Sequence, residues 1–389
     1  MINDLMKIVQ FVDSMYTGGA EASVCNMAIE MKRQGADVTV LCFSVRRSTG
    51  NESRLEEAGV KAVYLGEKCI ERLHLNRFRR TFIRYIAMIL LLVRVFRKTM
   101  LEESPDVLHF HLDALLFYPF IPRKMRNRIS CFWTIHSEPE VYLDKGILSF
   151  IRRNIIKKHP GIYLVTINEI GKKKTEGYGF ANPIIVIPNG ISMDRFLRAK
   201  ECRKKVRDEL CIAADAFVVG NIGRFGEGEK IKNQMFLVDI FEKIIEKKPE
   251  SILMLIGGGN PSDALKKRIS DCKCSEKIIL LTERSDIPEL LSAMDVFVMP
   301  SIYEGFPMTL IEAQAENLRC VVSDTVTRET SLTDRIRYES LEKGADVWAD
   351  AVISDPCSAP QGSIDDYDIR NTVKKTIKYY NNYYERKQL

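Results

Sequence analysis

Short apolar runs alternate with longer stretches of helical periodicity through the first half of the chain. The runs are four to seven residues long, which is typical of strands buried on both faces of a sheet. They occupy residues 7–12, 37–43, 61–65, 107–111, 131–136, 163–167 and 184–187. Helical patterns lie between them, for example up to residue 33 and over residues 75–103. This alternation predicts parallel βαβ units with helices on both faces of one sheet.

The second half of the chain repeats the alternation. Strands are predicted at residues 217–222, 251–256, 278–281, 296–299 and 320–323, and helices at 234–247, 263–272, 287–294 and 308–316. We therefore expect a first domain over residues 1–188, a second over 189–367, and a C-terminal helix over 368–389 that packs back on the first domain. Such sheets bind ligands at the carboxyl ends of their strands. Two doubly wound Rossmann-like domains facing each other across a cleft would serve an enzyme with two substrates.

The composition is that of a soluble globular protein, with 46% hydrophobic and 28% charged residues in a chain of 389. The ten cysteines are scattered and form no CxxC pair, so we expect reduced thiols rather than a disulfide framework or a zinc site. The longest uncharged apolar run, residues 85–93, is too short to span a bilayer, and residues 1–12 lack the features of a signal peptide. These features predict a cytoplasmic protein.

Positive charge is concentrated in the first half of the chain. Residues 1–190 contain 28 Lys and Arg against 19 Asp and Glu, a net charge of +9, whereas the remainder has 30 against 33, a net charge of −3. The densest segment is 68–98, with nine basic residues and one acidic residue. It is either a solvated helix face or a surface for anionic lipid or another polyanion, and the sequence leaves both interpretations open. Nucleic acid is not expected, because no aromatic residues interleave with the basic ones in a known binding module.

Two glutamates, Glu304 and Glu312, flank the predicted start of a helix that follows the buried strand 296–299. The backbone N–H groups of residues 308–310 are expected to be free at this helix start, where the partial positive charge favours a phosphate. The carboxylates cannot bind the phosphate, which is itself anionic, but they can accept hydrogen bonds from sugar hydroxyls. The pattern therefore indicates a ligand that carries both a phosphate and sugar hydroxyls.

Three other motifs also follow predicted strands. Gly18 and Gly19 stand between the first strand and a helix, where glycines allow a ligand to approach the backbone. Arg224 follows the strand 217–222, and His136 stands at the end of the strand 131–136. Each motif is a weak signal by itself. Together they place polar groups at the strand ends of both predicted sheets.

With these motifs, the chain resembles the family 4 glycosyltransferases of the GT-B fold and is most similar to the bacterial branch that builds exopolysaccharide, capsule and lipopolysaccharide. The resemblance extends over nearly the whole chain and implies a retaining enzyme that uses a nucleotide sugar. It implies that Glu304 contacts the donor sugar near the reaction centre and that Glu312 binds the nucleotide ribose. Further donor contacts are implied for Gly19, Gly305, Phe306, Met308, Thr309 and Leu310.

The resemblance also implies a cationic clamp on the donor diphosphate, formed by Arg224 and a following lysine. Lys230 and Lys232 are both candidates, and Lys232 fits better because it immediately precedes the next predicted helix. The loop between Arg224 and Lys232 is longer than is usual in the family. It carries Glu227 and Glu229, which we expect to be able to pair with Lys230 in solvent.

In the first domain, the resemblance implies that His136 reaches the donor sugar and that the Gly18-Gly19 loop faces the diphosphate. His109 and His111 alternate along the strand 107–111, so both should lie on one face of the sheet. They could form a metal pair, but no third ligand is apparent. The alternative is a structural His109 and a His111 near the acceptor.

These features together predict a metal-independent, retaining hexosyltransferase without a cofactor. It would transfer a sugar from a nucleotide diphosphate donor, with UDP favoured, to a hydroxyl of a lipid-linked or growing glycan in cell-surface polysaccharide synthesis. Glu304, His136, Arg224 and Lys232 are the expected catalytic residues. The protein would act in the cytoplasm, with peripheral binding to the membrane left open. The alternatives are a nucleotide-sugar epimerase of the same fold and a non-catalytic subunit.

Overall fold

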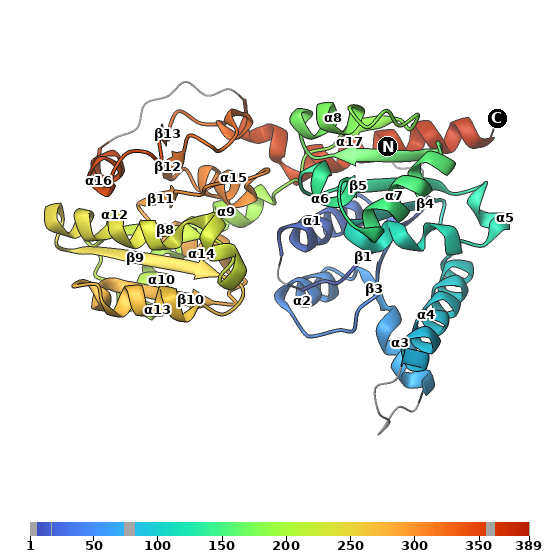
Figure 1. Ribbon diagram of the computed structural model, residues 1–389, viewed down its shortest axis with the longest axis horizontal. Coiled ribbons are helices and arrows are strands. Elements are labelled where there is room, and N and C mark those ends of the chain that lie inside the picture. Colours follow the sequence, from blue (N-terminus) through green and yellow to red (C-terminus); the bar gives the residue numbers. More distant parts are fainter. Residues whose placement is uncertain (1–5, 17, 74–81, 355–361, 389) are drawn as a thin grey trace. The chain divides into compact units, whose positions relative to one another are not determined.

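The computed structural model describes residues 6–16, 18–73, 82–354 and 362–388. The chain divides into two compact units (Figure 1). Unit 1 consists of residues 1–190 and 369–389, and unit 2 consists of residues 191–368. Each unit is a parallel β-sheet with helices on both of its faces, which confirms the predicted doubly wound fold class.

The sheet of unit 1 has seven strands in the order β3-β2-β1-β4-β5-β6-β7, and every neighbouring pair is parallel. The strands are β1 (Lys7–Val12), β2 (Asp37–Cys42), β3 (Lys61–Tyr64), β4 (Val107–His111), β5 (Ser130–Ile135), β6 (Ile162–Thr166) and β7 (Ile184–Val186). Each strand overlaps a predicted one. The order reverses between β1 and β4, which makes the ends of these two strands the topological switch point.

The helices of unit 1 include several that hydrophobic periodicity did not reveal. The α-helices are α1 (Gly19–Arg33), α2 (Gly50–Glu57), α3 (Leu65–Leu73), α4 (Phe82–Glu103), α5 (Arg123–Arg126), α6 (Pro139–Leu143), α7 (Ile147–Lys158), α8 (Glu169–Glu176) and α17 (Ile369–Gln388), with a 3₁₀ segment η1 (Leu112–Phe120). The predicted helix over residues 75–103 corresponds to α4, although its residues 75–81 lie outside the described residues.

The sheet of unit 2 has six parallel strands in the order β10-β9-β8-β11-β12-β13. They are β8 (Phe217–Ile222), β9 (Ser251–Gly257), β10 (Ile278–Thr282), β11 (Val296–Met299), β12 (Arg319–Ser323) and β13 (Ile336–Glu339). Five were predicted and β13 was missed. The switch point here lies between β8 and β11, the strands that precede Arg224 and Glu304.

The helices of unit 2 alternate with these strands. They are α9 (Met193–Ala199), α10 (Arg203–Glu209), α11 (Glu229–Lys232), α12 (Gln234–Lys247), α13 (Asp263–Ser270), α14 (Ile287–Ser292), α15 (Met308–Ala315) and α16 (Ala345–Ile353). Short 3₁₀ turns are η2 (Lys200–Cys202), η3 (Gly226–Gly228), η4 (Ser275–Lys277), η5 (Arg328–Thr330) and η6 (Ile364–Tyr367). Among the residues described in both units, no helix is long and apolar enough to cross a membrane.

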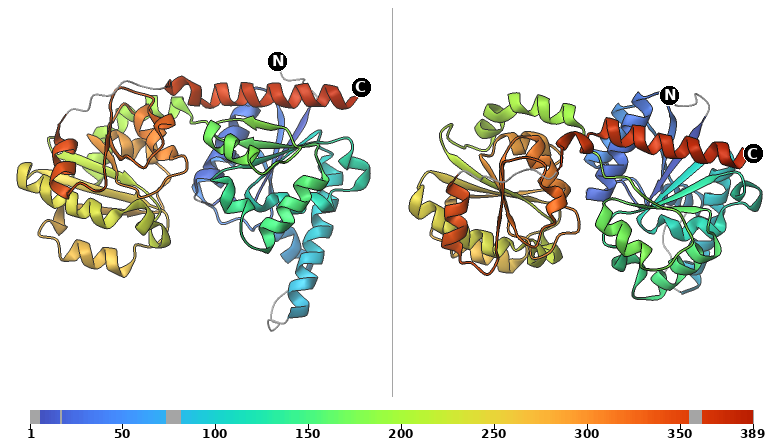
Figure 2. Two further views of the ribbon diagram at one scale, coloured as in Figure 1. Left: turned by 45° about the horizontal axis from the view of Figure 1, so that its top comes forward. Right: turned by 90° about the horizontal axis from the view of Figure 1, so that it is seen from above.

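Each sheet separates two apolar clusters, one on each face. In unit 1, the C-terminal helix α17 lies along α1 and completes the cluster on that face (Figure 2). Val373, Ile377 and Tyr380 of α17 are buried in it together with Val24 and Ala28 of α1. The last helix of the chain is therefore part of the core of unit 1.

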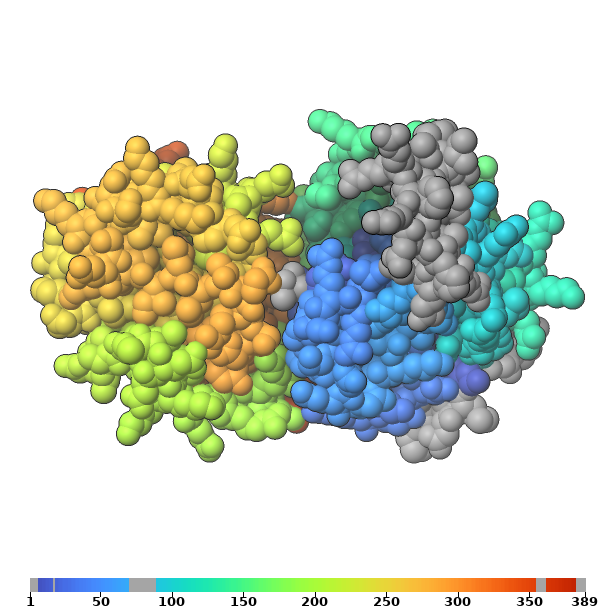
Figure 3. Space-filling model, turned by 90° about the horizontal axis from the view of Figure 1, so that it is seen from below, coloured from blue at the N-terminus to red at the C-terminus, as the bar shows by residue number. Residues whose placement is uncertain are grey.

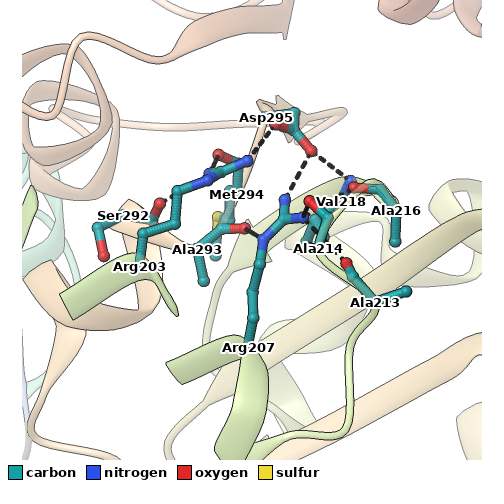
Figure 4. A network of polar contacts seen from close by, with 10 residues as sticks. All are labelled: Arg203, Arg207, Ala213, Ala214, Ala216, Val218, Ser292, Ala293, Met294 and Asp295. Atoms are coloured by element: carbon teal, nitrogen blue, oxygen red, sulfur yellow. Dashed lines mark hydrogen bonds and ion pairs between the residues drawn. The ribbon is translucent and has the colours of Figure 1, made fainter. Parts of the chain in front are cut away.

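A partly buried arginine network fixes α10 to the sheet of unit 2 (Figure 4). Arg203 and Arg207 pair with the two carboxylate oxygens of Asp295 at 2.6 and 2.9 Å, and Asp295 also accepts the N–H of Val218 at 2.7 Å. Arg207 is 3% exposed and also donates to four backbone carbonyls. The outer side of α10, yellow-green in Figure 3, is solvent-exposed. The network links the starts of β8 and β11, the strands that carry the candidate site.

Candidate functional site

The strongest contact among the predicted site residues is an ion pair in unit 2. Lys232, at the end of α11, places its Nζ 2.6 and 2.8 Å from the two carboxylate oxygens of Glu304, which follows β11. The side chains are 22% and 8% exposed. Ser301 donates from Oγ to Oε1 of Glu304 at 2.6 Å. The structure thus brings together two of the four predicted catalytic residues and adds Ser301, which sequence reasoning missed.

The sequence feature that could have identified Ser301 as a site residue is its position directly after a buried strand and a proline. Its hydroxyl is fully buried, and its carbonyl accepts a hydrogen bond from Thr325 Oγ1 at 2.9 Å. Ser301 is therefore held from two sides while it orients the carboxylate of Glu304. A small polar side chain at a strand end is the residue type that such a role requires.

The ends of β8 and β9 approach each other very closely beside this ion pair. A Cβ atom at Gly257 would lie 2.0 Å from the carbonyl oxygen of Gly223, so Gly257 must be a glycine. Gly223 in turn donates its N–H to Ile256 at 2.9 Å, and a Cβ there would lie 3.0 Å from Cγ of Lys232. These two glycines allow the lysine side chain to run over the strand ends toward Glu304.

The loop after Arg224 differs from the expectation. Glu229 was expected to pair with Lys230 in solvent, and this is wrong, because Glu229 is only 5% exposed. Its carboxylate accepts the N–H groups of Gly226 and Ser262 at 2.9 and 2.6 Å and also bonds the Ser262 hydroxyl. Buried backbone N–H groups need acceptors, and Glu229 supplies them, which folds the loop into a short helical turn.

This turn separates the two candidate lysines. Lys230 is exposed, whereas Lys232 is half-buried against Glu304. Asn233 follows in the left-handed region, with φ 55° and ψ 40°, and redirects the chain into α12. Arg224 is exposed at the beginning of the same loop. The geometry therefore favours Lys232 over Lys230 as the lysine of the site.

The predicted helix start between the two glutamates is α15, with Pro307 as its N-cap and no side-chain cap. Glu304 precedes the helix and Glu312 lies within it, as predicted. Of the three N–H groups expected to be free, that of Leu310 donates to the Pro307 carbonyl at 3.1 Å. The Leu310 side chain is fully buried in the core. Leu310 thus supports the helix, while Met308 and Thr309 are the partly exposed residues of its first turn.

Two neighbours complete the surroundings of α15. Phe306 stacks on Tyr367, with ring centroids 5.6 Å apart and an interplanar angle of 24°. At the other end of the helix, Asn317 adopts φ 63°, the left-handed conformation in which an Asn can stand in for a helix-terminating glycine. The ring of Phe306, a predicted donor contact, therefore already packs against a side chain of its own unit.

In unit 1, the Gly18-Gly19 motif is the N-terminus of α1. A Cβ atom at Gly18 would lie 2.2 Å from a carboxylate oxygen of Glu21, whereas a Cβ at Gly19 would meet nothing within 4 Å. The carboxylate of Glu21 thus folds back over Gly18, and this flexible side chain would have to move if residue 18 carried a Cβ atom. Gly19 is exposed, and the space at its Cβ position is open.

His136 is the end of a chain of buried polar side chains. Its Nε2 lies 2.8 Å from Nδ1 of His111, and Nε2 of His111 lies 2.7 Å from Oε1 of Gln10. His109 and His111 stack with ring centroids 4.4 Å apart, which confirms that they share one face of the sheet. Within the described part of the chain, no three His, Cys, Asp or Glu side chains are grouped to hold a metal ion.

Burial lowers the pKa of all three histidines. The pKa of His109 falls to about 3 and that of His136 to about 4, while that of His111 lies well below its ordinary value. The main cause is loss of hydration, which disfavours the charged imidazolium; in His136 the Asn189 side chain opposes it in part. All three rings are therefore neutral near pH 7.

Asp13 is a further residue that sequence reasoning missed, although it directly follows β1 at the switch point. Burial and the nearby carboxylate of Asp113 raise its pKa to about 7. Asp113 itself forms an ion pair with Arg152 at 2.5 Å, so the positive charge of Arg152 compensates Asp113 more closely than Asp13. The position of Asp13 after the first strand was a usable signal, because strand ends carry ligands in this type of sheet.

Comparison with known proteins points to one family over most of the chain. Residues 17–195 match the family described as Glycosyltransferase Family 4, and residues 216–353 match the family described as Glycosyl transferases group 1. Across 97–98% of both chains, the fold resembles solved structures at TM-scores of 0.70 for a Rickettsia africae glycosyltransferase and 0.65 for Anabaena HepE in complex with UDP, each at 16% identity.

Curated relatives cover different shares of the chain. EpsF of Bacillus subtilis, named as a glycosyltransferase, is 32% identical over 171 residues, which is 43% of each chain. The Escherichia coli UDP-Gal:alpha-D-GlcNAc-diphosphoundecaprenol alpha-1,3-galactosyltransferase is 34% identical over 144 residues, 36% of each chain. The Staphylococcus aureus capsular polysaccharide biosynthesis glycosyltransferase CapH is 24% identical over 368 residues, 90% of each chain. The matches to EpsF and the Escherichia coli enzyme thus span less than half of those proteins.

The two family matches follow the two units, since one lies almost entirely in unit 1 and the other in unit 2. The fold and the curated relatives agree with them. The chain therefore belongs to the family 4 glycosyltransferases of the GT-B fold, in the branch that contains bacterial polysaccharide enzymes.

Proposed function

We propose that the protein is a retaining glycosyltransferase that transfers a sugar from a nucleoside diphosphate donor to a hydroxyl of a lipid-linked or growing glycan in cell-surface polysaccharide synthesis. The observation that carries this proposal is the ion pair between Lys232 and Glu304 beside the start of α15. A cation for phosphate, a carboxylate for sugar hydroxyls and an uncapped helix N-terminus are gathered at the switch point of one sheet.

Each group in unit 2 has a distinct task in this proposal. Lys232 and Arg224 neutralise the diphosphate, and the N-terminus of α15 adds its partial positive charge. Glu304 accepts hydrogen bonds from the sugar, and Glu312 binds the ribose. A phosphate that reaches Lys232 would compete with Glu304 for the same ammonium group, so donor binding would free the carboxylate for the sugar.

In unit 1, Gly19 offers backbone space beside the N-terminus of α1, and His136 contacts the donor sugar. The neutral imidazole of His136 would hydrogen-bond to the sugar rather than act as a cation. We assign no covalent step to Glu304. The leaving phosphate would take the proton of the acceptor hydroxyl on the same face of the sugar from which it departs, which preserves the anomeric configuration.

We further propose that no metal ion or cofactor is needed and that UDP is the nucleotide. Two cations and a helix end can balance a leaving diphosphate without a divalent ion. UDP is named both in the Escherichia coli relative and in the HepE complex. The lipid-linked acceptor is proposed from the undecaprenol-linked substrate in the name of that same relative.

Transfer assays with a panel of nucleotide sugars test this proposal. The purified chain would be incubated with UDP-, GDP- and dTDP-sugars and undecaprenyl-diphosphate-linked acceptors, with and without excess EDTA. We expect transfer from a UDP-sugar that EDTA does not reduce, and NMR of the product should show the anomeric configuration of the donor. Interconversion of free UDP-sugars without transfer would indicate an epimerase instead, and binding without turnover would indicate a non-catalytic subunit.

The proposed membrane partner concerns α4, which carries the described end of the basic segment. The side chains of residues 70–88, which include five arginines of that segment, lie outside the described part of the chain. On the described part of α4, Arg94, Arg97 and Lys98 are exposed, and so are Ile89 and Leu90, each at 58%. Exposed apolar side chains beside cations are suited to the interface of an anionic membrane at the cytoplasmic face.

Vesicle sedimentation tests this surface. We expect the wild-type chain to bind vesicles with anionic lipid, to bind neutral vesicles less, and to be released by salt. Replacement of Ile89 and Leu90 by Ser should weaken binding severalfold. Ile147 and Phe150 on α7 provide the matched control, because they are 76% and 60% exposed on another helix of unit 1. If only their replacement by Ser reduced binding, α4 would be the wrong surface.

A further inference from the structure

The polar side chains beneath His136 form one continuous chain of hydrogen bonds in the core of unit 1. The distances along it are 2.8 Å from His136 to His111, 2.7 Å from His111 to Gln10, and 3.1 Å from Gln10 to Tyr380. It continues for 2.5 Å from Tyr380 to His109 and 2.6 Å from His109 to Thr134. The inner members are almost fully buried, so each must find its partner within the chain.

The amide of Gln10 sets the direction of the chain. Its Nε2 also contacts Sδ of Met31 at 3.6 Å, and a thioether sulfur can only accept. The NH₂ end of the amide therefore faces Met31 and Tyr380, and the carbonyl oxygen faces His111. Because a carbonyl oxygen cannot donate, Nε2 of His111 must carry the proton in this contact.

The direction of this contact propagates to His136. His111 is neutral, so it has a single ring proton, and that proton is on Nε2. Its Nδ1 is consequently an acceptor, and the contact at 2.8 Å requires Nε2 of His136 to donate. His136 is neutral as well, and its Nδ1 is left with a lone pair.

The other arm of the chain has the same direction. Tyr380 accepts from Gln10 and donates its hydroxyl proton to Nδ1 of His109, whose Nε2 then donates to Oγ1 of Thr134. All five hydrogen bonds thus run one way, from His136 to Thr134. Reversal at one bond would leave two donors or two acceptors facing each other in a dry core, which costs about 1–3 kcal/mol per unsatisfied group.

We propose that His111 is a positioning residue that holds His136 in its Nε2–H tautomer, so that His136 presents Nδ1 as a hydrogen-bond acceptor. Nδ1 of His136 is buried and has no hydrogen-bond partner among the described residues, although the Asn189 side chain, whose Oδ1 accepts from Ser23 Oγ at 2.8 Å, lies close to the imidazole. The ligand group that matches an acceptor is a hydroxyl. This proposal rests on the proposed function, in which that hydroxyl belongs to the donor sugar.

Nitrogen-15 NMR of the histidine side chains tests the tautomers directly in the full chain. The sequence contains five histidines, so single substitutions can assign the signals. We expect His111 and His136 to be protonated at Nε2 and unprotonated at Nδ1 at pH 7.5. Protonation of His136 at Nδ1 in the wild type would overturn the proposal. This readout is independent of activity: if the tautomers are as expected and no donor is turned over, the proposed function fails and the tautomer assignment stands.

Two variants of His111 separate positioning from simple packing. In His111→Asn, the side-chain oxygen lies near the former Nδ1 and can still accept from His136. The tautomer of His136 should therefore be unchanged, and the transfer rate should stay within about threefold of the wild type. In His111→Leu no acceptor remains, so the tautomers of His136 should mix and kcat should fall about tenfold with little change in donor KM. Equal losses in both variants, or unchanged tautomers in His111→Leu, would overturn the proposal.

Thr134→Val is the matched control at the far end of the chain. It removes the last acceptor, beyond Gln10, and leaves the contacts between His136, His111 and Gln10 in place. The melting temperature should fall, while the His136 tautomer and kcat stay unchanged. If Thr134→Val reduced kcat as much as His111→Leu, the role of His111 would be general stability of the core.

Discussion

The two units hold their candidate residues by opposite means. In unit 1, His136 belongs to a chain of neutral side chains that are directed by donor and acceptor chemistry. In unit 2, Glu304 is held by a full positive charge on Lys232 and by the hydroxyl of Ser301. The first arrangement fixes where a proton sits, and the second fixes where a charge sits.

This difference has a physical consequence for substitution. A buried neutral chain fails locally when one member is removed, because the next donor or acceptor loses its partner. An ion pair fails electrostatically, because the remaining charge attracts counter-charges or changes its pKa. The variants below use this difference, in order of decreasing expected effect.

The largest effect is expected for Glu304→Gln. The amide keeps the size of the side chain and can still contact Ser301, but it removes the negative charge beside the donor sugar. Loss of one positioned electrostatic contact costs about 10²–10³ in kcat. Steady-state transfer assays measure this loss. Glu342→Gln, the same substitution at an exposed residue, is the control and should leave the activity unchanged. A Glu304→Gln enzyme within twofold of the wild type would show that the charge has no role in the reaction.

The two lysines of the loop are expected to differ by a smaller factor. Lys232→Ala should lower transfer at least tenfold, because it removes a cation from the diphosphate and leaves Glu304 with Ser301 alone. Lys230→Ala should stay within twofold, because Lys230 is exposed on a turn that Glu229 anchors. Assays of both variants across donor concentrations decide this. Inactivation by Lys230→Ala alone would reverse the assignment.

Much of this picture could be read from the sequence, because periodicity and strand-end motifs are local properties. The alternation of strands and helices predicted both sheets, and Glu304 and His136 were singled out at predicted strand ends. Lys232 was singled out before a predicted helix, and the roles of all three came from the resemblance to family 4 glycosyltransferases. The pairing of Lys232 with Glu304 could not be predicted, since the residues are 72 positions apart and meet only through the order of β8 and β11.

The failures have equally specific causes. Glu229 was misplaced because the segment Gly226-Glu227-Gly228-Glu229 has the composition of a solvated loop, whereas the carboxylate of Glu229 accepts the backbone N–H groups of Gly226 and Ser262. The strand β13 was missed because Arg337 interrupts its apolar pattern at the edge of the sheet. The histidine chain depends on Tyr380, which is 271 positions from His109 and arrives with the last helix.

The acid sensitivity of unit 1 is the next expected effect. Its histidines have lowered pKa values when folded, so the unfolded chain binds protons first as the pH falls below about 6.5. The buried histidines should therefore lower the stability of unit 1 from pH 7.5 to pH 5 by on the order of 1–2 kcal/mol each, while Asp13, whose pKa is raised to about 7, contributes in the opposite direction. The two tryptophans, Trp133 in unit 1 and Trp348 in unit 2, allow each unit to be followed separately.

Denaturant titrations of Trp348→Phe, in which only Trp133 reports, would measure this dependence for unit 1. His109→Gln should flatten it, because the substitution removes a group that titrates on unfolding. Its stability at pH 7.5 should be lower than that of the parent, since the contacts with Tyr380 and Thr134 are disturbed. If the free energy of unfolding of His109→Gln changed with pH between 7.5 and 5 as steeply as that of the parent, His109 would not be buried in its neutral form.

The smallest effect is expected at Glu316 in unit 2, and its sign is opposite. Burial raises the pKa of this carboxyl to about 7, so the folded state binds its proton more tightly than the unfolded state does. The stability of unit 2 therefore decreases as the pH rises from about 4.5 to 7, and stays low above that. Glu316→Gln mimics the protonated form, so it should stabilise unit 2 at pH 8 by about 1 kcal/mol and change little at pH 4. In a Trp133→Phe background, the fluorescence of Trp348 alone reports the stability of unit 2. A loss of stability in Glu316→Gln at pH 8 would show that Glu316 is charged and paired in the folded unit.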